Sequence, residues 1–361
     1  MNNNITVEDW LKKWVNTYKR GNISNITLSS YILAINNYII PEMGKFELQK
    51  VQAINIQQLL TKMNLGQLET TNKCLSAKTI KDTYCILNMA FDTAINNNLL
   101  KENCVQKVTP PKLRKKEPQI MTIEEQRKFE QLFEGKYGFV VYLFLLKTGE
   151  RASEAAGSTW DDIDFNNKIV RVKNGIVRAE IFDENLVKKY NTIEDSDLKS
   201  ESSARKIPML FGLYDILLEY RRQYMEVNNI RSQKELKGKP LFLTEKKNRI
   251  QSDFLWTKLD RFLKKNDFRH IGIHQLRHTF ATRCLEAGIS VKYLQKLLGH
   301  STTRMTDRYT HLLSDFENDE NKKINDYYNK DMRKNSRKNT LKYNGKIMGK
   351  IRITKKLHKK G

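Results

Sequence analysis

The sequence predicts a mainly α-helical protein with a small antiparallel β-sheet (α+β), in which a helical domain precedes a larger second domain. Three observations lead to this fold class. Apolar side chains recur with helical spacing over the first hundred residues, a segment with three prolines follows at 108–118, and two short β-rich stretches then lie among further helices. At 361 residues the chain is long enough for two domains that each bury a core.

The N-terminal domain is predicted to be a bundle of helices. In the first helix, apolar side chains fall at i, i+3, i+4, i+7 and i+8: Val7, Trp10, Leu11, Trp14 and Val15. Thr6 is expected to cap this helix. Three more helices are predicted at about 28–40, 55–63 and 80–95, and Pro41 is expected to end the second because proline does not continue a helix.

The second domain is predicted to open at Thr122, which forms a capping-box pattern with Glu125. The elements that follow are a buried helix ending near Lys147, strands at 168–172 and 204–209 on either side of a polar connection at 183–203, and helices from about Leu213 and Ser252. This mixture of long helices and short strands is what predicts α+β rather than an all-helical fold.

The chain is strongly basic, with a formal net charge of +24 and a pI near 9.7. Such a charge usually reflects a polyanionic partner, and both nucleic acid and an acidic membrane surface fit it. Basic residues gather in the proline-containing segment and in the last segment, 331–361, which contains twelve Lys and Arg but only one Asp. Either these residues lie along DNA phosphates, or they form a solvated charge run. The candidates for DNA contact are Lys112, Arg114, Lys115, Lys116, Arg333 and Lys334.

Several other classes of protein fit poorly. No apolar run approaches the roughly 20 residues that span a bilayer, and no strongly basic helix with an exposed aromatic face indicates binding to a membrane surface. The four cysteines show neither metal-ligand spacing nor disulfide density, so we expect reduced thiols in a cytoplasmic protein. They are Cys74, Cys85, Cys104 and Cys284. No metal site and no cofactor are predicted.

A set of ionisable residues in the second domain has a spacing with chemical meaning. His274 and Arg277 lie three residues apart, so they share a helix face. His300 follows at the end of a later helix, and Tyr309 comes nine residues after it. Upstream, Arg151 follows an apolar helix beside a glycine. Residues that cap or end the intervening helices support this placement: Gly288, Ser290 and Gly299.

Each of these residues alone usually has a structural role, but together they supply every group that phosphodiester transfer needs. Arginine forks match the nonbridging phosphate oxygens and keep their charge. A tyrosine phenol is a nucleophile that can leave again. A lysine or histidine can protonate the departing 5′-oxygen.

The order Arg151, Lys199, His274, Arg277, His300 and Tyr309 resembles the active site of the tyrosine recombinase (phage integrase) family. The resemblance covers about residues 5–325. Its motifs are Thr148-Gly-x-Arg-x-Ser-Glu, Trp160-x-Asp-Ile-Asp164, Leu198-Lys-x-x-x-Ser-x-Arg-x-Ile-Pro208, His-x-x-Arg-His, Leu298-Gly-His-Ser301 and Tyr309-Thr-His. It implies a SAM-like helical core DNA-binding domain at 1–108, a basic linker at 109–118, a catalytic domain at 119–330 and a basic tail at 331–361.

The resemblance also implies a role for each residue. Tyr309 attacks the scissile phosphate and forms a 3′-phosphotyrosine, while Lys199 protonates the leaving 5′-oxygen. Arg151 and Arg277 hold the nonbridging oxygens, His300 adds a hydrogen bond, and His274 acts as acid and base for the tyrosine. Glu154 orients Arg151. The phosphotyrosine stores the bond energy, so neither metal nor nucleotide is expected.

Glu150 stands where the family usually has an apolar or small residue, and we expect it to face away from Arg151, since it would otherwise compete with phosphate. Lys199 is placed by alignment of its motif, and Lys206 and Lys189 are nearby alternatives.

The expected partners are double-stranded DNA attachment sites and further copies of the chain in a synaptic tetramer, which exchanges strands through a Holliday junction. An excision factor and a host DNA-bending protein are further possible partners, and the expected location is the bacterial cytoplasm, at the nucleoid. Alternative functions are a chromosome-dimer resolvase, a type IB topoisomerase, or a catalytically silent DNA-binding regulator.

Overall fold

The computed structural model describes residues 5–113, 119–196, 204–302 and 306. The chain divides into two compact units, Met1–Arg277 and His278–Gly361, and each unit is described by itself. Among the described residues, no helix combines the length and apolar character needed to cross a membrane.

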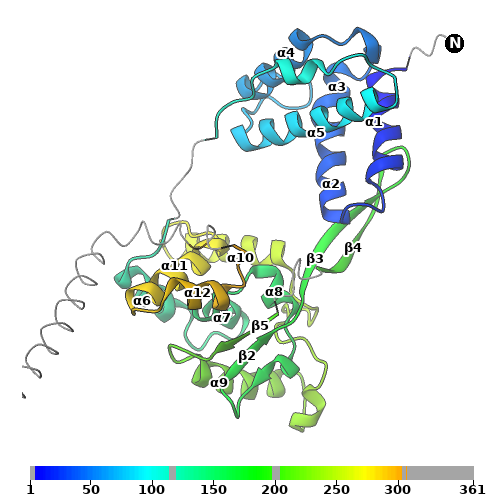
Figure 1. The fold of residues 1–361 in the computed structure, drawn as a ribbon. Coiled ribbons are helices and arrows are strands. Elements are labelled where there is room, and N and C mark those ends of the chain that lie inside the picture. Colours follow the sequence, from blue (N-terminus) through cyan, green and yellow to red (C-terminus); the bar gives the residue numbers. More distant parts are fainter. Residues whose placement is uncertain (1–4, 114–118, 197–203, 303–305, 307–361) are drawn as a thin grey trace, which may run out of the picture. The chain divides into compact units, whose positions relative to one another are not determined.

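The first unit begins with the predicted helical bundle (Figure 1). Its helices are α1 (Val7–Trp14), α2 (Asn25–Ala34), α3 (Ile40–Met43), α4 (Ala53–Leu65) and α5 (Ala77–Asn96). Thr6 caps α1 as expected, because its side-chain oxygen accepts a hydrogen bond from the Asp9 N–H at 3.1 Å. Two indoles tie α1 to α5: Trp10 donates to the Ala90 carbonyl and Trp14 to the Thr93 hydroxyl, each at 3.0 Å.

The expected helix end at Pro41 is wrong. After α2, the chain passes through a π-helical turn at Ile35–Ile39 into α3, and Pro41 lies in the first turn of α3. The N–H groups of a first turn have no partner within the helix, so a proline there removes no hydrogen bond. The wider turn therefore lets the helical path continue past the proline.

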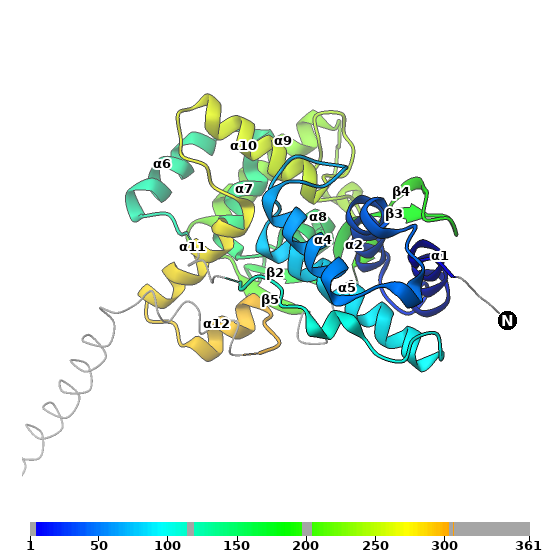
Figure 2. The ribbon, with the colours of Figure 1, turned by 90° about the horizontal axis from the view of Figure 1, so that it is seen from above.

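The polar connection predicted at 183–203 is also partly wrong, because much of it is a strand. β3 (Gly175–Phe182) and β4 (Lys188–Ser196) form an antiparallel hairpin. Figures 1 and 2 both show it beside α2. Ser29 donates to the Glu180 carbonyl at 2.7 Å, and Arg20 donates to the carbonyls of Phe182 and Asp183 at 2.9 and 2.8 Å.

The hairpin also contributes apolar side chains to the core of the bundle. Phe182 and Leu186 pack in the same buried cluster as Trp10, Trp14 and Phe91. The larger part of the unit has a separate buried cluster, which extends from Met121 to Leu276; it lacks Phe182 and Leu186 but includes Ile176 at the start of β3. The tip of the hairpin therefore shares its core with the bundle.

The rest of the first unit surrounds a small antiparallel sheet, as predicted. The sheet has the order β1-β2-β5, formed by β1 (Ile163–Asp164), β2 (Ile169–Val172) and β5 (Arg205–Pro208). The helices are α6 (Ile123–Phe133), α7 (Val140–Thr148), α8 (Ala152–Gly157), α9 (Leu213–Val227) and α10 (Ser252–Lys265). Thr122 and Glu125 form the expected capping box before α6.

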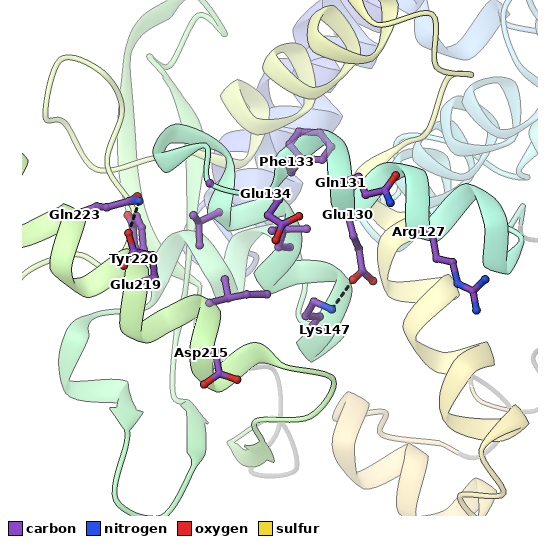
Figure 3. Close-up of a pocket in the computed structure, with 14 residues that line it drawn as sticks. Arg127, Glu130, Gln131, Phe133, Glu134, Lys147, Asp215, Glu219, Tyr220 and Gln223 are labelled. Carbon is purple, nitrogen blue, oxygen red and sulfur yellow. Dashed lines mark hydrogen bonds and ion pairs between the residues drawn. The ribbon is translucent and has the colours of Figure 1, made fainter.

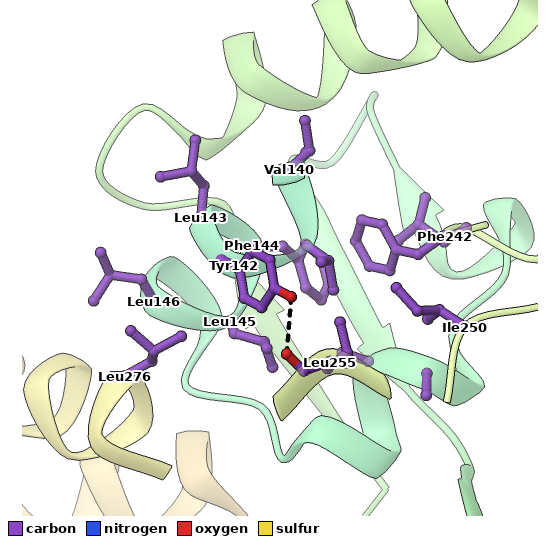
Figure 4. Packing of buried hydrophobic residues seen from close by; sticks show 14 of the residues in the cluster. Val140, Tyr142, Leu143, Phe144, Leu145, Leu146, Phe242, Ile250, Leu255 and Leu276 are labelled. Carbon is purple, nitrogen blue, oxygen red and sulfur yellow. Dashed lines mark hydrogen bonds between the residues drawn. The ribbon is translucent and has the colours of Figure 1, made fainter. Parts of the chain in front are cut away.

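Helix α7 lies at the centre of this core, and every one of its residues is buried. Figure 4 shows its side chains among those of neighbouring segments, including Phe242, Ile250 and Leu276. The Tyr142 hydroxyl donates to the Leu255 carbonyl at 2.9 Å, which satisfies a buried polar group. A helix buried on all sides gives the turn that follows it a rigid starting point.

Helix α11 (Ile273–Glu286) contains the boundary between the two units. In the second unit it is followed by α12 (Val291–Leu298), which Ser290 caps and after which Gly299 adopts a left-handed conformation with φ of 63°. Phe280, Cys284 and Leu294 belong to the buried cluster of this unit. The helix ends predicted at Gly288, Ser290 and Gly299 are therefore confirmed within one or two residues.

Candidate active site

The turn between α7 and α8 positions Arg151. Gly149 ends α7 in a left-handed conformation with φ of 65°, which glycine adopts without strain. Arg151 then caps α8: its N–H donates to one carboxylate oxygen of Glu154 at 2.8 Å, and its Nη1 donates to the other at 2.6 Å. About a third (32%) of the Arg151 side chain stays exposed. Its guanidinium is thus both oriented by Glu154 and open to a ligand.

Glu154 is the centre of an arginine cluster, which we define as Arg151, Arg205 and Arg277 around this carboxylate. Arg205 on β5 donates to Glu154 from Nη2 at 2.8 Å and from Nη1 at 3.2 Å. The Nη1 atom of Arg277 lies 4.0 Å from the same carboxylate. Arg205, Arg277 and Glu154 are all buried. A buried carboxylate with several cationic donors remains ionised and holds the arginines in fixed positions.

The pKa of Glu154 reflects these partners. Burial by itself raises the pKa of a carboxyl group, but the hydrogen bond and charge of Arg205, together with those of Arg151, lower it to about 2. Glu154 is therefore charged at neutral pH.

Helix α11 brings His274 and Arg277 to this cluster. Arg277 donates from Nη1 to the Gly149 carbonyl at 2.6 Å, so the same turn that orients Arg151 also anchors Arg277. His274 is exposed, yet the surrounding protein desolvates its ring, and the charges of Arg277 and Arg151 further lower its pKa from 6.5. His274 is thus a neutral imidazole at pH 7, able to accept a proton.

Glu150 lies in the middle of the turn. Neither of its carboxylate oxygens has a hydrogen-bond partner within the described part of the chain, so it does not bind Arg151. Its side chain is nevertheless buried, with 2% of the residue exposed. Burial raises the pKa of Glu150 to about 8, with Arg205 and Arg277 opposing the shift and Glu154 and Asp162 adding to it. This residue is therefore an uncharged acid at pH 7.

His300 belongs to the second unit, directly after Gly299. It is buried, and its Nδ1 lies 2.9 Å from the hydroxyl oxygen of Thr306. Its backbone N–H donates to the Gln295 carbonyl at 3.1 Å. The helix end thus fixes the backbone of His300, and Thr306 holds its ring.

Lys199 and Tyr309 lie outside the described residues, as do Arg114, Lys115, Lys116, Arg333 and Lys334. Lys112 is described and exposed. Of the two alternatives to Lys199, Lys206 is exposed on β5, and Lys189 on β4 forms an ion pair with Asp183 at 3.3 Å near the tip of the hairpin. Neither alternative belongs to the arginine cluster.

Arg205 is the member of this cluster to which we assigned no role from the sequence. The signal was present in the alternation along β5, where Arg205 and Ile207 are buried and Lys206 between them is exposed. An arginine in phase with a core isoleucine has to find a buried counter-charge. Glu154 provides it.

An apolar pocket of about 510 Å³ lies elsewhere in the first unit, between α6, α7 and α9. Figure 3 shows the ion pair between Lys147 and Glu130 at its edge, with a distance of 2.8 Å. No residue of the arginine cluster lines this pocket. Among the described residues, no group of three or more His, Cys, Asp or Glu side chains is arranged to hold a metal ion.

The chemical capacity of the cluster follows from its charges. Three arginines surround one ionised carboxylate, so the site carries a net positive charge whose geometry is fixed before any ligand arrives. Such preorganised charge stabilises a phosphate that gains negative charge in a transition state. Arginines do not lose their protons in proteins, so this capacity does not depend on their ionisation.

Comparisons with known proteins agree with this chemistry. The Phage integrase family matches residues 114–315, and the phage integrase N-terminal SAM-like domain matches residues 6–64. A tyrosine recombinase XerC-like protein of Caldanaerobacter subterraneus subsp. tengcongensis is 28% identical over 336 residues, which cover 90% of this chain and 84% of that protein. The transposase from transposon Tn916 of Enterococcus faecalis is 32% identical over 192 residues, which cover 51% of this chain and 44% of the transposase.

Solved structures share the fold. The Tn1549 transposon integrase in complex with a circular intermediate DNA has a TM-score of 0.66 and 24% identity, covering 84% of this chain and 94% of that chain. A lambda integrase tetramer bound to a Holliday junction has a TM-score of 0.61 and 19% identity, covering 83% and 78%. The chain therefore belongs to the phage integrase family, and it is a tyrosine recombinase that cuts and rejoins DNA.

Proposed function

We propose that this recombinase integrates and excises a mobile element or phage genome at specific DNA attachment sites. The observation that carries the proposal is the arginine cluster, in which Glu154 and the Gly149 carbonyl fix two arginines that the sequence assigned to the scissile phosphate. The proposal is supported by the similarity to a XerC-like recombinase over most of both chains, and by the similarity to a transposon transposase over about half of this chain.

In this proposal each residue of the motif has one task. Tyr309 attacks the phosphate, and Arg151 and Arg277 bind its nonbridging oxygens. Lys199 protonates the leaving 5′-oxygen. His274, neutral near pH 7, accepts the proton of the tyrosine. His300 donates a further hydrogen bond, and Glu154 positions Arg151 rather than taking part in the chemistry.

The same proposal covers domains and partners. Residues 1–108 bind the core DNA site, 109–118 form a linker along the phosphates, 119–330 carry out catalysis, and 331–361 form a basic arm. Four copies pair two sites in a synaptic tetramer, as in the lambda integrase tetramer. An excision factor and a host bending protein set the direction, and the enzyme acts on nucleoid DNA in the bacterial cytoplasm.

Replacing the nucleophile tests the reaction. Tyr309→Phe removes only the phenol oxygen, so we expect no covalent adduct and unchanged DNA binding. The measurement uses a nicked duplex that spans the joined ends of the element, followed by a denaturing gel. An adduct formed by the phenylalanine variant would remove Tyr309 from its role. Relaxation of supercoiled DNA without pairing of sites would favour the topoisomerase alternative.

The lysine assignment has its own test. Lys199→Ala should slow cleavage by roughly 10²–10⁴, the range for a lost general acid. A substrate with a bridging 5′-sulfur, whose leaving group needs no proton, should restore the rate. Lys206→Ala is the matched control and should cleave both substrates normally. Sulfur rescue of the Lys206 variant in place of the Lys199 variant contradicts the assignment.

A further inference from the structure

Packing alone does not explain the burial of Glu150 in the first unit. It is covered almost completely, and its carboxyl group has no hydrogen-bond partner among the residues that the structure describes. A buried polar group without a hydrogen-bond partner destabilises the folded protein. An apolar or small side chain at this position would carry no such cost.

The position of Glu150 in the chain connects it to two arginines. The preceding residue, Gly149, accepts the hydrogen bond of Arg277, and the following residue, Arg151, binds Glu154. The charged groups that act on the Glu150 carboxyl come from four elements: Arg205 on β5, Arg277 on α11, Glu154 on α8 and Asp162 in the turn Trp160–Asp162. Glu150 thus adjoins the cluster without being bonded into it.

The charge of the cluster depends on the state of this one group. With Glu150 neutral, three arginines face the single charge of Glu154. With Glu150 ionised, they face two carboxylates, and the charges of Arg205 and Arg277 then act on Glu150 as well as on the phosphate. Because two like charges disfavour each other, a phosphate at Arg277 also opposes ionisation of Glu150. This coupling is reciprocal, as any linkage between two binding equilibria must be.

We propose that Glu150 is a positioning residue for strand cleavage: as a neutral acid it leaves the charge of Arg277 to the scissile phosphate, and as an anion it withdraws that charge. DNA at the cleavage site and a proton on Glu150 then favour each other. The enzyme therefore loses cleavage activity as the pH rises and Glu150 ionises. A variant with an apolar side chain at this position would not show this loss. The inference rests on the proposed function, since it concerns the phosphate that the arginines bind.

The test compares pH profiles of phosphotyrosine formation. Glu150→Gln keeps the shape and removes the ionisation, and Glu150→Leu also removes the polar group. Glu134→Gln is the matched control, because Glu134 is an exposed glutamate outside the cluster. Rates are measured on the nicked duplex over a pH range on both sides of 8, which is the value to which burial raises the pKa of Glu150.

We expect wild type and the Glu134→Gln control to lose cleavage activity in parallel as the pH rises above the pKa of Glu150. The ratio of the Glu150→Gln rate to the wild-type rate should rise about tenfold for each further pH unit, because only the protonated fraction of wild type is active. Glu150→Leu should give the same ratio. At saturating DNA the wild-type transition should move to higher pH than at limiting DNA, since bound phosphate opposes ionisation. A residue with a purely structural role would change the rates equally at every pH.

Two results distinguish a failure of the proposed function from a failure of the inference about Glu150. If wild type forms no phosphotyrosine at any pH, the proposed function fails. If wild type is active and both Glu150 variants follow its pH profile, the proposed function stands and the inference about Glu150 is overturned. Should neither variant fold, calorimetry of DNA binding by wild type in two buffers of different ionisation enthalpy decides: proton uptake near pH 8 supports the role of Glu150, and no uptake overturns it.

Discussion

The turn after α7 and the first turn of α8 each bury a glutamate to the same extent, with 2% of Glu150 and 2% of Glu154 exposed. The pKa values of the two carboxyl groups nevertheless differ by several units. Glu154 accepts hydrogen bonds from two arginines, and its pKa falls to about 2. Glu150 accepts none from a described residue, and burial raises its pKa to about 8. The two side chains are four residues apart in the chain and equally buried, so their different hydrogen-bond partners account for the difference in charge.

The largest effect that tests this comparison is expected from Glu154→Gln. The variant leaves Arg205 buried beside a neutral amide, so the free energy of unfolding should fall by about 3–5 kcal/mol. Urea unfolding at pH 7 measures the loss. The double variant Glu154→Leu, Arg205→Met removes both members of this buried ion pair, and we expect much of the stability to return; Arg277 stays buried, with its hydrogen bond to the Gly149 carbonyl. A loss no larger than that of an exposed glutamate would mean that the ion pair does not organise this core.

The second prediction concerns pH, and the two glutamates should act in opposite directions. Glu154 has a lowered pKa, so its contribution is present above 4.5 and is lost as pH falls towards about 2. Glu150 has a raised pKa, so the protein becomes less stable as pH rises from 4.5 to about 8, where the unfolded chain releases a proton that the folded chain keeps.

Glu150→Gln should remove this second dependence. Relative to wild type, the variant should gain on the order of 2–4 kcal/mol in free energy of unfolding between pH 5 and pH 8. Urea unfolding of both proteins at several pH values gives the difference. A difference that stays constant with pH would show that Glu150 is ionised in the folded protein.

The smallest effects compare two neighbours on β5. Arg205→Lys keeps the charge but loses the fork that reaches Glu154 with two nitrogens, and it should cost roughly 1–3 kcal/mol. Lys206→Ala removes an exposed side chain and should change the free energy of unfolding by about 0.5 kcal/mol at most. Thermal unfolding under identical conditions ranks the two. Equal losses would mean that the alternation along this strand has been assigned wrongly.

The sequence predicted much of the fold, because helices with a clear apolar stripe and explicit caps carry their own signals. The capping box at Thr122 and the glycine after α12 are examples. The hairpin β3–β4 was missed because its second strand is polar and exposed along much of its length, and contacts with α2 stabilise it. The helix end at Pro41 was predicted wrongly because a π-helical turn of five residues precedes it, and no local sequence pattern indicates that turn.

The candidate site was predictable in its residue types but not in its charges. The spacing of His274 and Arg277 and the position of Arg151 indicated phosphate chemistry, and the structure brings Arg151 and Arg277 to one carboxylate. That Arg205 completes the cluster depends on a strand about fifty residues away along the chain. That Glu150 is buried without a hydrogen-bond partner among the described residues depends on the packing around a single turn, which no local pattern encodes.

The shared core of the hairpin and the bundle has a consequence for exchanging parts between relatives. Residues 175–196 follow α8 in the chain, yet their tip supplies Phe182 and Leu186 to the core formed by the first helices. A chimera that takes its first hundred residues from another recombinase therefore inherits only part of that core. The tip of the hairpin has to come from the same parent as the bundle, whereas Ile176 at its start packs in the other core. The unit to be exchanged is therefore discontinuous in the gene.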